Sequence, residues 1–307
     1  MINIFDTFIK TNNLNCIKTK VASKDLTTIK CGGEVDYLAE PENIDELSVL
    51  FQFICSNNIP YKILGNGSNV LISDMGFNGV FFSLKNLPYS IEQLENTLTV
   101  VANIECINLQ KKCILEGLSG LEFLSGIPGT IGGLIAMNAG AFDHDISEVL
   151  VSLQVLNDQG DEVQYIKDNI DFSYRKTSLP ISKFIITEGT FRVKKENMHI
   201  VKQRSDEYMS RRRSSNLWQV STFGSTFKNG SNFYAGELIE KCGLKGFSIG
   251  DAYISNDHAN FIINKGNASA EDVYLLIQKM KNDVKKKFDK DLELEVKLWG
   301  DFSYAGK

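Results

Sequence analysis

Residues 117–142 read GLSGLEFLSGIPGTIGGLIAMNAGAF, a stretch with seven glycines, one proline and a single charged residue, Glu122. Glycine adopts positive φ angles and lets a backbone approach a ligand closely. The proline and the glycines interrupt the apolar run well before it reaches the length of a membrane-spanning helix. Two interpretations stay open: a buried, folded-back loop whose N–H groups face a bulky anion, and a tight core crossover without a ligand.

A second glycine-rich segment lies upstream. Residues 61–73 read YKILGNGSNVLIS, which predicts a strand, a turn at residues 65–69 and a second strand. Small residues with free N–H groups between two strands can form a phosphate-binding nest, although an ordinary hairpin has the same composition. The segment lacks the spacing of the dinucleotide fingerprint GxGxxG and has no Gly-Lys-Ser/Thr of a phosphate-binding loop.

Composition limits the classes of protein that the chain can belong to. The chain has 307 residues, 43% hydrophobic and 23% charged, which is typical of a soluble globular protein. The net charge of −5 argues against binding to nucleic acid. Six cysteines without CxxC spacing predict free thiols in a reducing compartment. No secretory signal or membrane span is evident and the three histidines are scattered, so we expect a cytoplasmic protein without a metal site.

Local patterns divide the chain into α+β units. Asn43 with Glu46 predicts a capped helix, and the turn at residues 157–160 predicts a hairpin within residues 149–166. Ser269 with Asp272 predicts a second cap, and residues 292–299 (LELEVKLW) predict a closing strand. The predicted elements fall into three units, which are residues 1–84, 85–198 and 199–307.

Three side chains could carry chemistry, although each has an ordinary explanation. Arg175 lies among aromatic and small polar residues, where a guanidinium can bind a carboxylate through two bonds or form a surface ion pair. Ser225 lies in a glycine-containing turn and is a typical turn former. Glu295 lies on the predicted closing strand, where a glutamate usually faces solvent.

Taken together, seven motifs occur in an order that resembles one flavoprotein family. The motifs are ILGNGSNVLIS, SGLEFLSGIPGTIGGLIAMNAGAF, SYRKTSL, FGSTFKNG, YAGELIEKCGLKG, HANFIIN and LELEVKLWG, between about Thr28 and Gly300. The family is that of the UDP-N-acetylenolpyruvoylglucosamine reductases (UDP-N-acetylmuramate dehydrogenases) of bacterial peptidoglycan precursor synthesis, hence of cell-wall biogenesis, cell shape and cell division. The chain is similar to the short form of the family, because residues 264–295 leave no room for an inserted tyrosine-bearing loop.

The resemblance implies a fold and a set of ligands. The fold is α+β, with a two-subdomain FAD-binding module of the vanillyl-alcohol-oxidase type followed by a C-terminal α+β substrate domain. Residues 1–84 would form an N-terminal arm and the first FAD-binding subdomain, residues 85–198 the second, and residues 199–307 the substrate-binding domain. The implied cofactors are non-covalent FAD and NADPH, the implied partner is a UDP-sugar, and a monomer is expected.

The resemblance also implies roles for individual residues. The FAD pyrophosphate would be wrapped by Gly65, Asn66, Gly67, Ser68 and Asn69, and the flavin would be lined by Gly129, Thr130, Gly132, Gly133, Asn138 and Ala139. The catalytic residues would be Arg175, Ser225 and Glu295, and the substrate would be bound by Tyr174, Arg213, Lys228, Asn229 and His258. The chain departs from the family pattern at Gly230, where proline is usual, and at Asp143-His144, where a glycine-rich turn is commoner.

The implied reaction is the reduction of an enolpyruvyl group. NADPH would reduce FAD, and flavin N5 would deliver hydride to the vinyl carbon of UDP-N-acetylglucosamine enolpyruvate. Arg175 would stabilise the enolate-like charge, a protonated Glu295 would donate a hydrogen bond to the same oxygens, and Ser225 would protonate the neighbouring carbon. Two alternatives stay open: an FAD-dependent oxidase on the same scaffold, and a non-catalytic flavin-binding protein.

Overall fold

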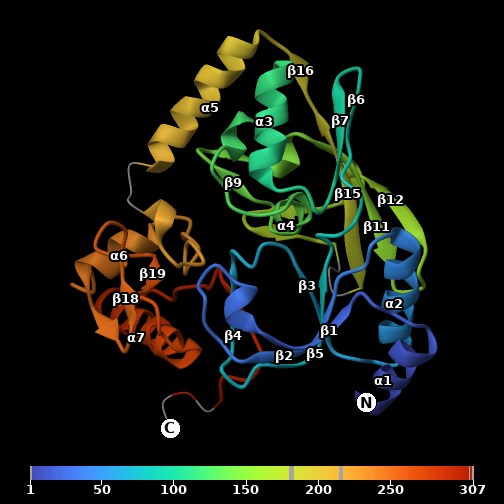
Figure 1. Ribbon diagram of the computed structural model, residues 1–307. Helices are drawn as coiled ribbons and strands as arrows, with labels where there is room; N and C mark the ends of the chain where they lie inside the picture. The colour runs from blue at the N-terminus through green and yellow to red at the C-terminus, as the bar shows by residue number, and fades with distance from the viewer. Residues whose placement is uncertain (1, 180–182, 214–216, 304, 306–307) are drawn as a thin grey trace. The chain divides into compact units, whose positions relative to one another are not determined.

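The computed structural model describes residues 2–179, 183–213, 217–303 and 305 (Figure 1). The chain divides into two compact units that are each built from separate segments. Unit 1 comprises Met1–Lys18, Tyr37–Gly65 and Val80–Arg212, and unit 2 comprises Thr19–Asp36, Asn66–Gly79 and Arg213–Lys307.

Helices and strands alternate irregularly along the chain. The α-helices are α1 (Ile2–Thr11), α2 (Ile44–Ser56), α3 (Cys106–Glu116), α4 (Ile131–Ala136), α5 (Met198–Arg213), α6 (Ala235–Lys241) and α7 (Ala270–Phe288). The strands up to residue 145 are β1 (Ile17–Ala22), β2 (Glu34–Ala39), β3 (Tyr61–Leu64), β4 (Val70–Ile72), β5 (Phe77–Ser83), β6 (Ile91–Leu94), β7 (Thr97–Val101), β8 (Leu118–Ser119), β9 (Gly140–Ala141) and β10 (His144–Asp145). The later strands are β11 (Leu150–Asn157), β12 (Glu162–Ile166), β13 (Phe172–Ser173), β14 (Lys176–Thr177), β15 (Phe184–Arg192), β16 (Lys194–Lys195), β17 (Ser248–Ile249), β18 (Ala252–Ile254), β19 (Ile262–Asn264) and β20 (Lys297–Trp299). Short 3-10 turns occupy Ser23–Asp25, Glu122–Leu124, Ile146–Glu148, Lys167–Asn169 and Leu217–Gln219.

The largest sheet lies in unit 1 and has the strand order β12-β11-β15-β7-β6, with antiparallel pairing throughout. The predicted hairpin at residues 149–166 is confirmed as β11 and β12. Its turn forms because Asn157 Oδ1 accepts hydrogen bonds from the N–H groups of Gln159 (2.9 Å) and Asp161 (2.8 Å). Helix α4 packs against β15 and places the glycine-rich stretch beside this sheet.

The core of unit 1 is a single hydrophobic cluster. It includes the inward faces of α2, α3, β7 and β11, with Phe51, Leu109, Leu98 and Val155 fully buried. Burial of side chains of this size stabilises the fold by roughly 1.5–3 kcal/mol each. The predicted cap of α2 is confirmed, because Asn43 Oδ1 accepts the Glu46 N–H at 2.8 Å.

Unit 2 has its own core around helix α7. The antiparallel sheet β17-β18-β19 contacts this helix, and β4 pairs in parallel with β20. The buried cluster combines Val273 and Met280 of α7 with Ile29 and Leu71, which come from far upstream in the sequence. Two distant segments of the N-terminal third therefore complete the core of this unit.

Two elements differ from the sequence-based expectations. The predicted strand at residues 292–299 is a strand only over β20, because the N–H groups of Glu295 and Val296 both donate to the carbonyl of Thr226 instead of forming a regular ladder. The glycine-rich stretch is not a loop throughout, since it contains the short helix α4. Among the described residues, no helix has the length and hydropathy needed to cross a membrane.

Candidate active site

Arg175 lies at the tip of a tight hairpin in unit 1. Strands β13 and β14 pair Ser173 with Lys176, so Tyr174 and Arg175 form the turn, and Arg175 has a left-handed backbone (φ 57°). Its guanidinium donates a hydrogen bond from Nη2 to the carbonyl of Gly140 at 3.0 Å and lies 4.9 Å from the centre of the Tyr174 ring. The carbonyl of Gly140 and the ring of Tyr174 therefore hold the guanidinium in position. Tyr174 itself is half exposed.

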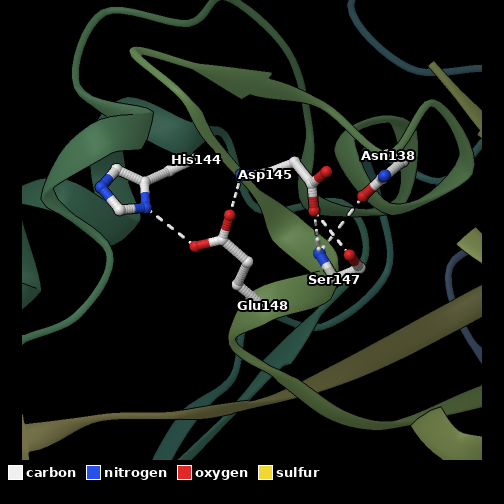
Figure 2. A network of polar contacts seen from close by, with 5 residues as sticks. All are labelled: Asn138, His144, Asp145, Ser147 and Glu148. Carbon is white, nitrogen blue, oxygen red and sulfur yellow. Dashed lines mark hydrogen bonds and ion pairs between the residues drawn. The ribbon is translucent and has the colours of Figure 1, made fainter. Parts of the chain in front are cut away.

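The segment that receives this guanidinium is fixed by a network of polar side chains, shown in Figure 2. Asn138 is 1% exposed, and its Oδ1 accepts the N–H of Ser147 at 3.2 Å. Asp145 and Glu148 form a capping box on the 3-10 turn Ile146–Glu148, and Glu148 also contacts Nδ1 of His144 at 2.8 Å. Asp143-His144, where the chain departs from the family pattern, thus lies in a hairpin that the carboxylates of Asp145 and Glu148 hold in place.

Two positions of the predicted FAD site lie side by side in unit 1. A Cβ atom at Gly65 would come within 2.6 Å of Oγ1 of Thr130, so any other residue here would require one of the two to shift. Thr130 precedes helix α4, on which Gly133 is exposed. The two glycine-rich segments therefore come into close contact at Gly65 and Thr130.

The backbone amides of the central stretch are used in part by the protein itself. The N–H of Gly132 donates to Ala102 and the N–H of Ala139 to Leu134, and the carbonyl of Gly129 accepts the N–H of Cys106. The expectation that this stretch turns its N–H groups toward an anion therefore does not hold for Gly132 and Ala139.

The remainder of the 65–69 turn belongs to unit 2. Gly67 has φ 60°, and a Cβ there would lie 2.1 Å from the carbonyl oxygen of Leu26, so the position requires glycine. Asn69 donates from Nδ2 to the carbonyl of Glu295 at 3.2 Å, and its own carbonyl accepts the Lys297 N–H at 3.0 Å. Asn66 precedes Gly67, and Ser68 lies between Gly67 and Asn69. The turn and the predicted catalytic glutamate are thus directly linked.

Ser225 and Glu295 lie on adjoining backbone segments of unit 2. The carbonyl of Thr226 accepts the N–H of Glu295 at 3.0 Å, and Ser225 forms an isolated β-bridge with Phe261. The buried side chain of Asn260 holds the same segment, because it accepts the Phe227 N–H at 3.0 Å and donates to the Phe227 carbonyl at 2.8 Å. The structure thus places the backbone segments of Ser225 and Glu295 next to each other, whereas Arg175 belongs to unit 1.

The predicted substrate-binding residues of unit 2 lie on the same segment or near it. Lys228 forms an ion pair with Glu293, and its N–H donates to the Glu293 carbonyl at 2.9 Å. Asn229 accepts the N–H of Ala235, the first residue of α6, at 3.0 Å. The side chain of Arg213 lies outside the described part of the chain.

His258 presents a neutral imidazole. Its Nδ1 accepts the Asn260 N–H at 3.2 Å, and partial loss of solvent around the ring lowers its pKa. A neutral ring that accepts at Nδ1 carries its proton on Nε2, which leaves that N–H as a donor.

Sequence reasoning missed three cations near these residues. In unit 1, Arg211 lies 4.3 Å from the centre of the Phe142 ring. Burial lowers the pKa of Arg212, and the positive charge of Arg175 lowers it further to a smaller extent. In unit 2, loss of hydration and the neighbouring Lys228 lower the pKa of Lys297. Their signal in the sequence was the run of arginines at 211–213 and the lysine two residues after Glu295.

Family models match both parts of the chain. Residues 35–165 match the model of the FAD binding domain, and residues 216–299 match that of the UDP-N-acetylenolpyruvoylglucosamine reductase, C-terminal domain. The close contact of Gly65 with Thr130 lies within the residues of the first match. The fold and the matches define an FAD-dependent oxidoreductase of the α+β class.

Relatives of similar length narrow this class to one family. The UDP-N-acetylenolpyruvoylglucosamine reductase of Clostridium novyi is 37% identical over 294 residues, which is 94% of this chain and 93% of the relative. That of Caldicellulosiruptor saccharolyticus is 38% identical over 301 residues, with coverage of 97% and 96%. The crystal structure of UDP-N-acetylenolpyruvylglucosamine reductase from Thermus caldophilus superimposes with a TM-score of 0.80 at 33% identity, covering 92% of this chain and 99% of that one. The chain belongs to the UDP-N-acetylenolpyruvoylglucosamine reductase family.

Family membership confirms several predictions. The fold class is confirmed as an α+β FAD-binding domain followed by the C-terminal domain of the reductase family. The chain is a flavoenzyme of a family that acts in peptidoglycan precursor synthesis. The domain boundaries at residues 84 and 198 and the roles of individual residues stay predictions.

Proposed function

We propose that this enzyme uses NADPH and FAD to reduce the enolpyruvyl group of UDP-N-acetylglucosamine enolpyruvate, forming UDP-N-acetylmuramate. The observation that carries the proposal is the hydrogen bond between the Glu295 N–H and the Thr226 carbonyl at 3.0 Å. It fixes a carboxyl-bearing residue next to the segment of Ser225, so an acid and a hydroxyl can act on one substrate. Bound FAD, once reduced by NADPH, supplies the hydride.

Arg175 is assigned to the substrate carboxylate. Hydride addition to the terminal vinyl carbon pushes negative charge onto the conjugated carboxylate, and a guanidinium with fixed donors stabilises that charge. The bond from Arg175 to Gly140 and the contact with Tyr174 hold the guanidinium in place before the substrate arrives. This preorganisation supports the role.

Ser225 is assigned to protonation of the carbon beside the carboxylate. A serine hydroxyl is a weak acid, but an enolate carbon is a strong base, so a hydroxyl held at contact distance suffices. Glu295 in its protonated form would donate a hydrogen bond to the substrate carboxylate. Asn260 and Asn69 support both residues, because their side chains bond to the backbone at Phe227 and Glu295.

The UDP-sugar is assigned to the remaining predicted residues. Lys228 and Arg213 would offset the charge of the diphosphate, while Asn229, Tyr174 and the Nε2–H of His258 would donate hydrogen bonds to sugar or phosphate oxygens.

The non-glycine nest residues Asn66, Ser68 and Asn69 would contact the FAD pyrophosphate. The monomeric state and the cytoplasmic location also stay predictions from the sequence.

An anaerobic reoxidation experiment tests the function. The holoprotein is reduced with NADPH under argon, UDP-N-acetylglucosamine enolpyruvate is added, and the flavin absorbance is followed. Rapid return of the oxidised spectrum without oxygen supports the reductase. Return only when air is admitted would point to an oxidase instead.

The role of Ser225 is tested by separating the two half-reactions. Ser225→Ala should leave flavin reduction by NADPH nearly intact and slow reoxidation by the sugar by at least about 100-fold, because only the second half needs the proton. Ser248→Ala, an exposed serine of the same unit, is the matched control. An equal loss in both halves would remove Ser225 from the assigned role.

A further inference from the structure

A closed ring of contacts joins the glycine-rich stretch to the Arg175 hairpin. Asn138 donates from Nδ2 to the carbonyl of Ser173 at 3.1 Å, and Arg175, two residues after Ser173, donates back to Gly140 at 3.0 Å. Gly140 is in turn two residues after Asn138. We propose that Asn138 is a positioning residue, whose amide sets the hairpin so that the Arg175 guanidinium meets the substrate carboxylate.

Asparagine is suited to this position for three physical reasons. Its backbone is left-handed (φ 40°), a conformation that asparagine tolerates better than most residues. Its side chain is buried, so both polar ends need partners, and both have them in Ser173 and Ser147. Aspartate would keep the shape and the bond from Ser147 but would turn an oxygen toward the Ser173 carbonyl.

The second bond of Asn138 anchors the ring to a rigid support. The N–H of Ser147 donates to Asn138 and, at 3.1 Å, also to Asp145 (Figure 2). Asp145 belongs to the capping box that closes the Ile146–Glu148 turn. Asn138 therefore transmits the position of a capped turn to the hairpin that carries Arg175.

This inference rests on the proposed function, and it assigns Asn138 an action that differs from flavin contact. The side-chain amide is engaged with protein groups at both ends, so its removal should free the hairpin and leave flavin binding in place. A 1 Å displacement of a group that stabilises a transition state can cost about 100-fold in rate. Asn138→Asp should therefore lose about 10- to 100-fold in reoxidation by the sugar and less than about two-fold in reduction by NADPH.

Limited proteolysis tests the hairpin without relying on any activity. Trypsin cleaves after Arg175 and Lys176, and a loosened two-residue turn exposes these bonds. Cleavage there, identified by fragment mass, should be at least about five-fold faster in Asn138→Asp and Asn138→Gly than in the wild-type holoenzyme. Asn138→Gly keeps the left-handed backbone free of strain, and Asn58→Asp, an exposed asparagine with φ 51°, is the matched control.

A double-mutant cycle then asks whether Asn138 acts through Arg175. In an Arg175→Ala background, single-turnover reoxidation followed over hours should change less than about two-fold when Asn138→Asp is added, because no guanidinium is left to misplace. If adding Asn138→Asp slows reoxidation by the same factor with and without Arg175, the proposal is overturned. Loss of FAD from both Asn138 variants, with unchanged tryptic cleavage after Arg175 and Lys176, overturns it as well. If the wild-type flavin is not reoxidised by the sugar, the proposed function fails, while trypsin still decides whether Asn138 holds the hairpin.

Discussion

At the scale of a single residue, the hydrogen bond between His258 and Asn260 requires a neutral imidazole ring. Its Nδ1 accepts the Asn260 N–H, and a proton on Nδ1 would abolish that bond. Loss of solvent around the ring holds its pKa below the ordinary value, so the unfolded chain takes up this proton at a higher pH than the folded chain. The stability that the neutral ring contributes is therefore present above the unfolded pKa and is lost as the pH falls through the folded pKa.

We predict that His258→Asn removes this part of the pH dependence. The amide oxygen of asparagine replaces Nδ1 as the acceptor for Asn260 and does not titrate. Between pH 7.5 and pH 5 the wild-type free energy of unfolding should fall more steeply than that of the variant, as measured by urea denaturation. Because His144 and His199 are present in both proteins, the difference isolates His258. Parallel curves for the two proteins would contradict the prediction.

At this scale the sequence predicts the candidate site only as residue identities, and the roles of these residues stay predictions. The motifs singled out Arg175, Ser225 and Glu295 because their order along the chain is distinctive. They could not show that the Asn138 amide is already bonded to Ser173 and Ser147, because those partners depend on tertiary contacts. The cations at Arg212 and Lys297 were missed for the same reason.

At the scale of elements, helix α7 shows how a local signal and a distant one combine. The predicted capping box of Ser269 and Asp272 is confirmed, with both reciprocal bonds near 3.0 Å. The carboxylate of Asp74, 196 residues upstream of Ala270, additionally accepts the N–H groups of Ala270 and Glu271 at 2.9 Å each. No helix-start pattern in the sequence could reveal this second cap.

We predict that Asp74→Ala lowers the free energy of unfolding by about 1–2 kcal/mol, the usual worth of a cap plus the favourable helix-dipole interaction. Thermal unfolding of the holoenzyme measures the change. The control is Asp283→Ala on the same helix, whose partially exposed pair with Lys279 should contribute at most about 0.5 kcal/mol. A loss for Asp74→Ala no larger than that of the control would show that Ser269 and Asp272 alone hold the helix start.

The elements that could not be predicted are those whose strand pairing depends on a segment distant in the sequence. Residues 292–296 alternate like a strand, yet Glu295 and Val296 share one acceptor, the Thr226 carbonyl. By contrast, the hairpin of β11 and β12 contains its own partner and its own turn signal. Its register, with Leu156 opposite Glu162, follows from the Asn157–Gly160 turn. Local pairing was readable from the sequence, whereas pairing with a distant segment was not.

At the scale of the whole molecule, sequence order and spatial units differ. The chain enters unit 2 first at Thr19–Asp36, again at Asn66–Gly79, and for a third time from Arg213. Ile29 and Leu71 are both fully buried in the core of this unit. A boundary drawn from composition places such short segments with their sequence neighbours, since nothing local marks their distant packing.

This arrangement predicts that the C-terminal segment does not fold alone. A fragment of residues 213–307 would lack β4, the parallel partner of β20, and the Asp74 carboxylate at the start of α7. It would also lose Ile29 and Leu71 from the core, and truncating one such buried side chain already costs about 2–5 kcal/mol. The sum approaches or exceeds the 5–15 kcal/mol that stabilises a typical domain. Circular dichroism and amide NMR of the fragment should therefore show no cooperative unfolding, and co-expression with residues 1–212 should restore a folded complex that binds FAD. Cooperative melting of the isolated fragment would instead show that the helix and the β17-β18-β19 sheet suffice without the two upstream segments.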